Sequence, residues 1–274
     1  MELLTGYEGN AFASTGHKII VDNFSEKHEE LKILNSCIKE CDRCRLSFGR
    51  VHAVCGEGNV DARLFFIAQA PGEMEDKAGK MFVGPTGKVI NELFHEVSLK
   101  REEVYMTNLI KCRLPKNRKP KSDEVELCGK YLDQEIEMIK PEFLIPLGYH
   151  AAKYVFNHYC KMISLSPDST GKLVYCNGQK IYPLQHPSAV LYNPSFKHTM
   201  IRAFKRISVF KKDCKWYPMC PMKRFFEEGR LDKKWIELYC QGDWESCVRY
   251  QMEEKGEFHP DNMLPDGTIN YKIK

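Results

Sequence analysis

Cysteine spacing gives the first indication of chemistry in this chain of 274 residues. Cys41 and Cys44 form a Cys-x2-Cys pair, which places two thiolates on one side of a turn, ready to share a metal. Cys112 and Cys128 extend the pattern to C-x2-C-x67-C-x15-C. By ligand type, four thiolates suit a zinc ion and a [4Fe–4S] cluster equally well, although so wide a gap is unusual for a zinc ribbon.

A second group of four cysteines lies near the carboxyl end, in the pattern C-x5-C-x19-C-x6-C: Cys214, Cys220, Cys240 and Cys247. All three tryptophans lie between them. About 60 residues are too few for a large core, and modules of that size often need a metal. Because the paired C-x2-C spacing of zinc sites is absent, we expect a second iron–sulfur cluster. Zinc is the next interpretation, and four reduced core cysteines are the third.

The remaining cysteines that the sequence singles out lack any ligand spacing: Cys37, Cys55, Cys160 and Cys176. They are interpreted as small buried residues.

Polar residues that follow short apolar runs are the other indication of chemistry. Gln69 to Gly72 follow the run ARLFFIA, and Asn108 ends the run VYMTN. His186 follows a third segment, in the stretch PLQHP. Open α/β sheets bind ligands beyond the carboxyl ends of their strands, so these residues are expected at one site. An amide side chain both donates and accepts hydrogen bonds, and a histidine donor can stabilise developing negative charge.

Strand and helix signals alternate along the chain. Short apolar runs predict strands at Ala62–Ala68, Val104–Cys112 and Phe143–Leu147. Helical signals cover Ser25–Cys41, Thr86–Val97, Ser122–Ile139, Gly148–Phe156 and Ser195–Lys212. A hairpin is expected at Gly171–Ile181, because Asn-Gly between strands is a strong type I′ turn signal. Such alternation predicts an α/β fold, a three-layer α/β/α sandwich with a central, mainly parallel sheet.

The same signals divide the chain into three parts. Residues 1–24 show no periodicity and are expected to form a loose lead-in. Residues 25–212 form the α/β domain, and residues 213–274 form a small Cys-rich module that binds a metal or cluster.

Several motifs resemble those of the family 4 uracil-DNA glycosylases, the iron–sulfur branch of that superfamily. The first region carries GEGN-x-DA, APG-x-x-ED and G-x-x-FVG-x-x-G, all between Gly56 and Gly87. TNLIKCRLPKNRKP is similar to the family's TN-x-x-KCRPP-x-NR-x-P, and HPSAVLYNP to its HPAALLRNP. The resemblance implies a glycosylase-like domain that flips uracil out of DNA and hydrolyses its N-glycosidic bond. It also implies a [4Fe–4S] cluster on Cys41, Cys44, Cys112 and Cys128.

The resemblance also suggests roles for single residues. Phe82 would stack on the base, Asn108 would pair with O4 and N3–H of uracil, and His186 would donate to O2. Glu75 would lie near C5 and disfavour the methyl group of thymine. The other implied contacts are base binding by Ala70 and Gly72, a wedge into the duplex by Leu191 and Tyr192, and phosphate contacts by Lys116, Arg118 and Lys119.

Gln69 is the main departure from the family pattern, which has GEAPG where this chain has AQAPG. The family's Glu is thought to orient water or to stabilise positive charge at the sugar. Gln69 can orient water but cannot carry negative charge. The alternative function is therefore a non-hydrolytic or altered-specificity member that binds damaged DNA or a modified base. By proximity, Glu73 is a candidate substitute for the missing carboxylate.

Composition sets the remaining expectations. There is no run of about 18 apolar residues, so no membrane span is expected. The first 20 residues lack the apolar region of a secretory signal, and 12 cysteines then favour a reducing, cytoplasmic location.

The net charge is only +4, but residues 111–121 and 197–212 each hold six Lys or Arg and no acid. These runs predict contacts with DNA phosphates. We expect a monomer.

Overall fold

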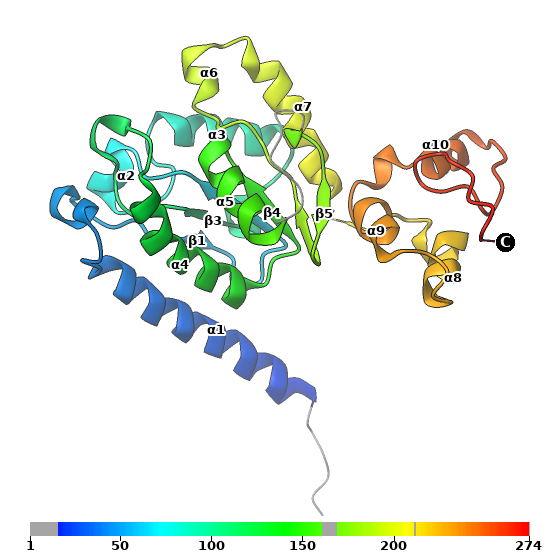
Figure 1. Ribbon diagram of the computed structural model, residues 1–274, viewed down its shortest axis with the longest axis horizontal. Helices are drawn as coiled ribbons and strands as arrows, with labels where there is room; N and C mark the ends of the chain where they lie inside the picture. The colour runs from blue at the N-terminus through cyan, green and yellow to red at the C-terminus, as the bar shows by residue number, and fades with distance from the viewer. Residues whose placement is uncertain (1–15, 161–168, 211, 274) are drawn as a thin grey trace, which may run out of the picture.

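Apolar runs form the strands of a central six-stranded sheet, drawn as arrows in Figure 1. The computed structural model describes residues 16–160, 169–210 and 212–273. The strands are β1 (Glu57–Gly58), β2 (Leu64–Ala68), β3 (Val104–Asn108), β4 (Phe143–Pro146), β5 (Val174–Cys176) and β6 (Gln179–Ile181). Their order is β1-β3-β2-β4-β6-β5. The four inner strands are parallel, and β1 and β5 pair antiparallel at the edges, so the predicted mainly parallel sheet is confirmed.

Helices cover both faces of the sheet, because successive residues of a strand point to opposite sides. Phe65 and Ile67 of β2 pack on the side of α1, α4 and α5, whereas Leu64 and Phe66 pack on the side of α3 and α7. This arrangement confirms the predicted three-layer sandwich. The helices of this domain are α1 (Gly16–Lys39), α2 (Glu73–Ala78), α3 (Pro85–Glu96), α4 (Ser122–Ile139), α5 (Tyr149–Tyr159), α6 (Ala189–Tyr192) and α7 (Phe196–Val209). Its short helical turns are η1 (Arg45–Gly49), η2 (Arg101–Glu103) and η3 (Pro115–Asn117).

The amino-terminal helix is longer than expected. The sequence predicted a loose lead-in over residues 1–24, but α1 begins at Gly16. Residues 1–15 lie outside the described part of the chain. Leu31, Leu34 and Ile38 are the buried side chains that dock this helix. Its amino-terminal part extends beyond the sheet layers in Figure 1. Over this part the sequence shows no helical periodicity of apolar residues, so the helix was not predicted there.

The hairpin β5–β6 has the predicted turn: Asn177 and Gly178 both have positive φ, 48° and 85°. Cys160 is buried, as predicted, but Cys176 and Cys55 are only half-buried. Cys160 and Cys176 form a disulfide with a Cα–Cα distance of 5.6 Å, which their sequence spacing did not indicate. Cys160 caps α5 and Cys176 ends the edge strand β5, so the fold brings the two thiols together. Cys37 is exposed, which also differs from its expected burial.

The carboxyl-terminal residues form a small, mainly helical unit beside the β5 edge (Figure 1). Its elements are η5 (Tyr217–Met219), α8 (Pro221–Glu227), α9 (Lys233–Trp235), η6 (Ile236–Cys240), η7 (Trp244–Ser246) and α10 (Val248–Lys255). Its apolar cluster contains only residues 222–273. Lys180 of β6 reaches it by pairing with Glu237 at 2.9 Å, and Arg206 of α7 pairs with Asp243. A domain boundary at residue 212 remains our proposal.

No helix within the described ranges is both long and apolar enough to cross a membrane.

Candidate active site

The residues that follow four parallel strands meet in one cavity of about 430 Å³ at the carboxyl edge of the sheet. Gln69 and Gly72 come after β2, Asn108 ends β3, and Gly148 follows β4. His186 comes after β6, where Leu184 still bridges to Leu147. The structure therefore brings together the polar residues that the sequence placed at strand ends.

Asn108 and Phe82 lie in the wall of this cavity. The Asn108 side chain is 2% exposed, and its Nδ2 donates to Sδ of Met81 at 2.9 Å. Phe82 is buried and has a positive φ of 49°, which is uncommon for a bulky residue. Nη2 of Arg101 holds this turn by donating to the carbonyl oxygens of Met81 and Phe82 at 3.1 and 3.2 Å. A side chain at Gly87 would meet the Phe82 oxygen, so this turn needs the last glycine of the motif G-x-x-FVG-x-x-G.

His186 is half-buried and faces the cavity from the loop after β6. Its Nδ1 accepts a hydrogen bond from the backbone N–H of Ser188 at 3.3 Å and lies 2.8 Å from Oγ of that residue. In the neutral ring the proton then sits on Nε2, the remaining nitrogen. Burial lowers the pKa of His186 to about 4, against a smaller opposing effect of Glu75. The imidazole is therefore neutral at neutral pH and can donate from Nε2.

Glu75 is the buried carboxylate of the cavity wall, in the first turn of α2. Its Oε1 accepts from the backbone N–H of Gly84 at 2.8 Å. A side chain at Gly72 would come within 2.6 Å of its Oε2, so the small residue leaves room for this carboxylate. Ala70, also small, lines the same wall.

Gln69 is half-buried in the cavity lining, and its carbonyl oxygen accepts from the N–H of Ile110 at 3.0 Å. Glu73 is not in a position to replace a carboxylate there. Its exposed side chain pairs with Lys77 at 2.7 Å and with Arg113 at 3.1 Å, and these cations lower its pKa. The hypothesis that Glu73 substitutes for the family's Glu is therefore not supported.

Sequence reasoning missed two aromatic neighbours of the cavity, Tyr149 and His150, at the start of α5. Burial lowers the pKa of His150, with Lys119 and Lys153 adding to the effect. The signal was present, because both residues directly follow a strand and Gly148 with its positive φ of 85°.

The expected DNA contacts differ in how accessible they are. Leu191 and Tyr192 of α6 are 47% and 87% exposed, and Tyr192 stands at the cavity. Lys116 and Lys119 are exposed on the loop that includes η3, whose Asn117 lines the cavity. Arg118 differs from the expectation: its guanidinium binds the buried carboxylate of Glu124 through two hydrogen bonds, 2.8 and 2.5 Å long. This pairing raises the pKa of Arg118 and makes it a structural residue of the loop.

The second basic run is also partly neutralised. Lys197 pairs with Glu92 at 2.8 Å, and Arg206 is bound to Asp243 of the carboxyl-terminal unit. Arg202 and Lys205 are the exposed cations of α7.

The four cysteines of the first group line one small cavity between α1, η1 and α4: Cys41, Cys44, Cys112 and Cys128. Sγ of Cys112 accepts from Nη1 of Arg50 at 3.2 Å, and Sγ of Cys128 accepts from the N–H of Lys111 at 3.2 Å. In the described ranges, no three His, Cys, Asp or Glu side chains are grouped to hold a metal ion.

Comparison with known proteins agrees with this geometry. The sequence model of the uracil DNA glycosylase superfamily matches residues 55–207, and the chain belongs to that superfamily. A type-4 uracil-DNA glycosylase of Saccharolobus solfataricus is 38% identical over 188 residues, 65% of this chain and 85% of the relative. That of Thermotoga maritima is 37% identical over 169 residues, 62% of this chain and 87% of the relative.

Proposed function

We propose that this protein is a uracil-DNA glycosylase of DNA repair. The observation that carries the proposal is the single cavity in which Asn108, Phe82 and His186 meet at the carboxyl edge of the sheet. Two type-4 uracil-DNA glycosylases are 37–38% identical over 62–65% of this chain, which supports the hydrolytic function over the alternative of a binder without turnover. The expectations of a monomer and of a cytoplasmic location stay predictions.

The reaction places a flipped uridine in the cavity, because the bond to be broken is inaccessible in a stacked duplex. The ring of Phe82 offers a stacking face, and the amide of Asn108 offers both a donor and an acceptor to the base edge. This pairing favours uracil over cytosine, whose exocyclic amine reverses the hydrogen-bond pattern. Glu75 and the loop of Ala70 and Gly72 close the cavity on another side.

Hydrolysis breaks the bond between N1 of uracil and C1′ of the sugar, and the electron pair leaves with the base. Nε2–H of His186 donates to the base oxygen on which the negative charge develops. Water adds its OH to C1′, and its second proton ends on the released uracil. Gln69 is the candidate group to orient that water, because its amide lies in the same cavity and can accept a hydrogen bond.

We also propose that Cys41, Cys44, Cys112 and Cys128 hold a [4Fe–4S] cluster. All four line one cavity, and Arg50 places a cation against it, which suits an anionic occupant. The cluster would link α1 to the loop that carries Lys116 and Lys119, and its role would be structural. Those two lysines, with Leu191 and Tyr192, form the proposed DNA contact.

One assay tests the proposed activity. The protein is incubated with oligonucleotides that carry one uracil, single- and double-stranded, and abasic sites are then cleaved with alkali. We expect cleavage only at uracil, and its loss in Asn108→Ala. A matched oligonucleotide with thymine in place of uracil serves as the control. If the wild-type protein binds uracil-DNA tightly but forms no abasic sites, the alternative function, a binder without hydrolytic activity, is correct instead.

A further inference from the structure

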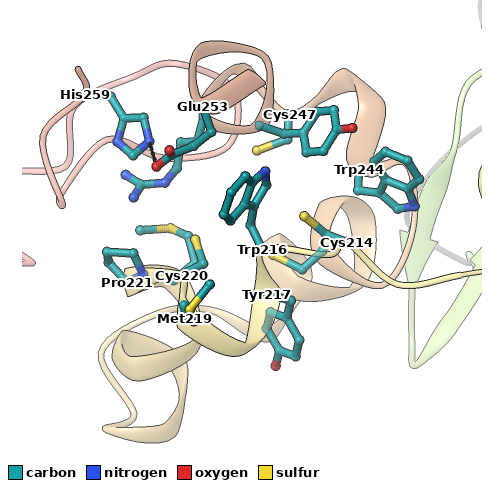
Figure 2. Close-up of a pocket in the computed structure, with 14 residues that line it drawn as sticks. Cys214, Trp216, Tyr217, Met219, Cys220, Pro221, Trp244, Cys247, Glu253 and His259 are labelled. Carbon is teal, nitrogen blue, oxygen red and sulfur yellow. Dashed lines mark hydrogen bonds and ion pairs between the residues drawn. The ribbon is translucent and has the colours of Figure 1, made fainter. Parts of the chain in front are cut away.

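The second group of cysteines converges on one cavity of about 250 Å³ inside the carboxyl-terminal unit. Figure 2 shows Cys214, Cys220 and Cys247 around it, and Cys240 also lines it. The four come from separate segments. Cys214 precedes η5, Cys240 ends η6, and the other two directly precede α8 and α10. The backbone N–H of Cys214 donates to the carbonyl oxygen of Cys240 at 2.7 Å, so these segments are already in contact.

A buried cation also faces this cavity. Arg249 lines it and is only 2% exposed. Its Nη1 donates to the carbonyl oxygens of Pro260, Asp261 and Met263. Within the described residues, its Nε and Nη2 have no hydrogen-bond partner. A buried charge with unsatisfied donors is costly unless an anion compensates it. Four thiolates around a divalent core carry a net negative charge, which is the compensation that Arg249 lacks.

The thiols themselves are set up as ligands. The backbone N–H groups of Tyr250 and Arg249 donate hydrogen bonds to the sulfur of Cys247. The N–H of Trp216 does the same for Cys214. Amide donors aimed at sulfur stabilise a thiolate, and such hydrogen bonds are a regular feature of iron–sulfur ligation.

We propose that Cys214, Cys220, Cys240 and Cys247 bind a second [4Fe–4S] cluster, which Arg249 neutralises in part. The size of the cavity favours a cluster over zinc. It is several times larger than the roughly 30 Å³ share of one water, far more than a single ion needs. The proposal does not depend on the glycosylase activity.

The composition of the unit gives the cluster a structural role. Its buried apolar cluster has few members besides Cys240: Met222, Phe225, Leu231, Ile236, Leu264 and Ile273. A core of that size rarely stabilises a fold alone, and small modules commonly gain the missing stability from metal binding. The superfamily match ends at residue 207, so the unit lies outside it.

Iron and acid-labile sulfide analysis of the full-length protein, purified without oxygen, tests the proposal. Two clusters predict about eight iron atoms per chain. Cys240→Ser should leave about four, and so should Cys112→Ser, which removes a ligand of the other cluster. The matched control is Cys37→Ser, an exposed cysteine that lines neither cluster cavity, and it should keep about eight. About four iron atoms with one zinc in the wild type would overturn the proposal.

Tryptophan fluorescence provides a second readout, because all three tryptophans lie in this unit. Trp216 and Trp244 line the cavity, so an iron–sulfur cluster bound there would quench their emission. We expect Cys240→Ser to be brighter and red-shifted, and Cys112→Ser to keep the wild-type emission. If Cys240→Ser does not fold, the wild-type iron count still decides. Equal iron content and emission in the wild type and Cys240→Ser would refute the second cluster.

Discussion

His186 is a neutral donor, and this has a consequence for the pH dependence. Its pKa is lowered from 6.5 to about 4, so the neutral ring persists as the pH falls through 6.5. We expect kcat/KM for uracil-DNA to stay level from pH 8 to about pH 5 and to fall below that. Between pH 6.5 and pH 4 the unfolded state binds more protons at His186 than the folded state does. The free energy of unfolding therefore decreases as the pH falls from 6.5 to 4.

The pH profile of Ser188→Ala is the control for this assignment. The variant loses the Oγ contact but keeps the backbone N–H that fixes Nδ1 as an acceptor. We expect an unchanged acid limb, whereas His186→Ala should lose most of the activity. An acid limb centred near pH 6.5 in the wild type would contradict a neutral, buried His186.

Gln69→Glu should increase the rate. The transition state places positive charge on the sugar, and Gln69 is a neutral residue in the lining. A carboxylate at this position should raise kcat more than it tightens binding, by on the order of 10²-fold. Single-turnover kinetics on a uracil oligonucleotide measures this change.

Glu73→Gln is the matched control for that substitution. Glu73 is paired with Lys77 and Arg113 outside the cavity, so its loss should leave the rate unchanged. If Gln69→Glu slows the reaction while Glu73→Gln also reduces it, water activation at Gln69 is disproved.

At the scale of elements, the loop around η3 is the part that should respond to salt. Lys116 and Lys119 are exposed there, and release of counterions makes phosphate binding fall steeply with salt. With about four phosphates contacted, the slope of log K against log salt should be near −3 to −4. We expect Lys116→Glu with Lys119→Glu to flatten it by about two units in fluorescence anisotropy titrations.

A control with one charge reversal instead of two is Lys255→Glu, at the exposed end of α10. Its slope should equal that of the wild type. Arg118→Gln should behave differently again, with lower stability because Glu124 loses its partner. If the slope of log K against log salt is the same for the double lysine variant, Lys255→Glu and Arg118→Gln, the DNA does not contact the loop around η3.

Local signals explain which elements the sequence predicted. The apolar runs of β2 and β4 and the Asn177-Gly178 turn are determined by neighbouring residues, and they form as expected. Features that depend on distant partners could not be predicted. The disulfide of Cys160 with Cys176 spans 16 residues, and the pairing of Arg118 depends on the burial of Glu124. The first turns of α1, from Gly16 onward, show no apolar periodicity in the sequence, so the position of the helix start could not be predicted.

At the scale of the whole molecule, the amino-terminal cysteines join segments that are far apart in sequence. Replacing Cys112 by Ser should remove the proposed cluster of that site and loosen α1 and η1 from α4. Hydrogen exchange should then show faster exchange in those segments, while β2 and β4 stay protected. Cys37→Ser, on the exposed side of α1, should exchange like the wild type. Unchanged protection of α1 in Cys112→Ser would argue against a structural cluster.

The candidate site was predictable in outline because parallel strands deliver their last residues to one edge. Asn108 and His186 were found in this way, since each follows a strand. His150 also follows a strand, but it was overlooked because no family motif includes it. The roles of Glu73 and Arg118 could not be predicted, because they depend on ion pairs with Arg113 and Glu124. The exposure and the ion pairs of charged side chains depend on the folded structure, so the sequence alone does not predict them.

The left-handed backbone at Phe82 limits which residues this position can accept. Such a conformation costs a non-glycine residue on the order of 1 kcal/mol or more, which glycine avoids. Glycine would also remove a buried ring from the apolar cluster of α3 and α7, and the loss of a buried Phe costs about 3 kcal/mol or more. Packing therefore outweighs the strain, and the same ring gives the cavity its flat wall. A substitution here cannot exchange stability for activity, because it lowers both together.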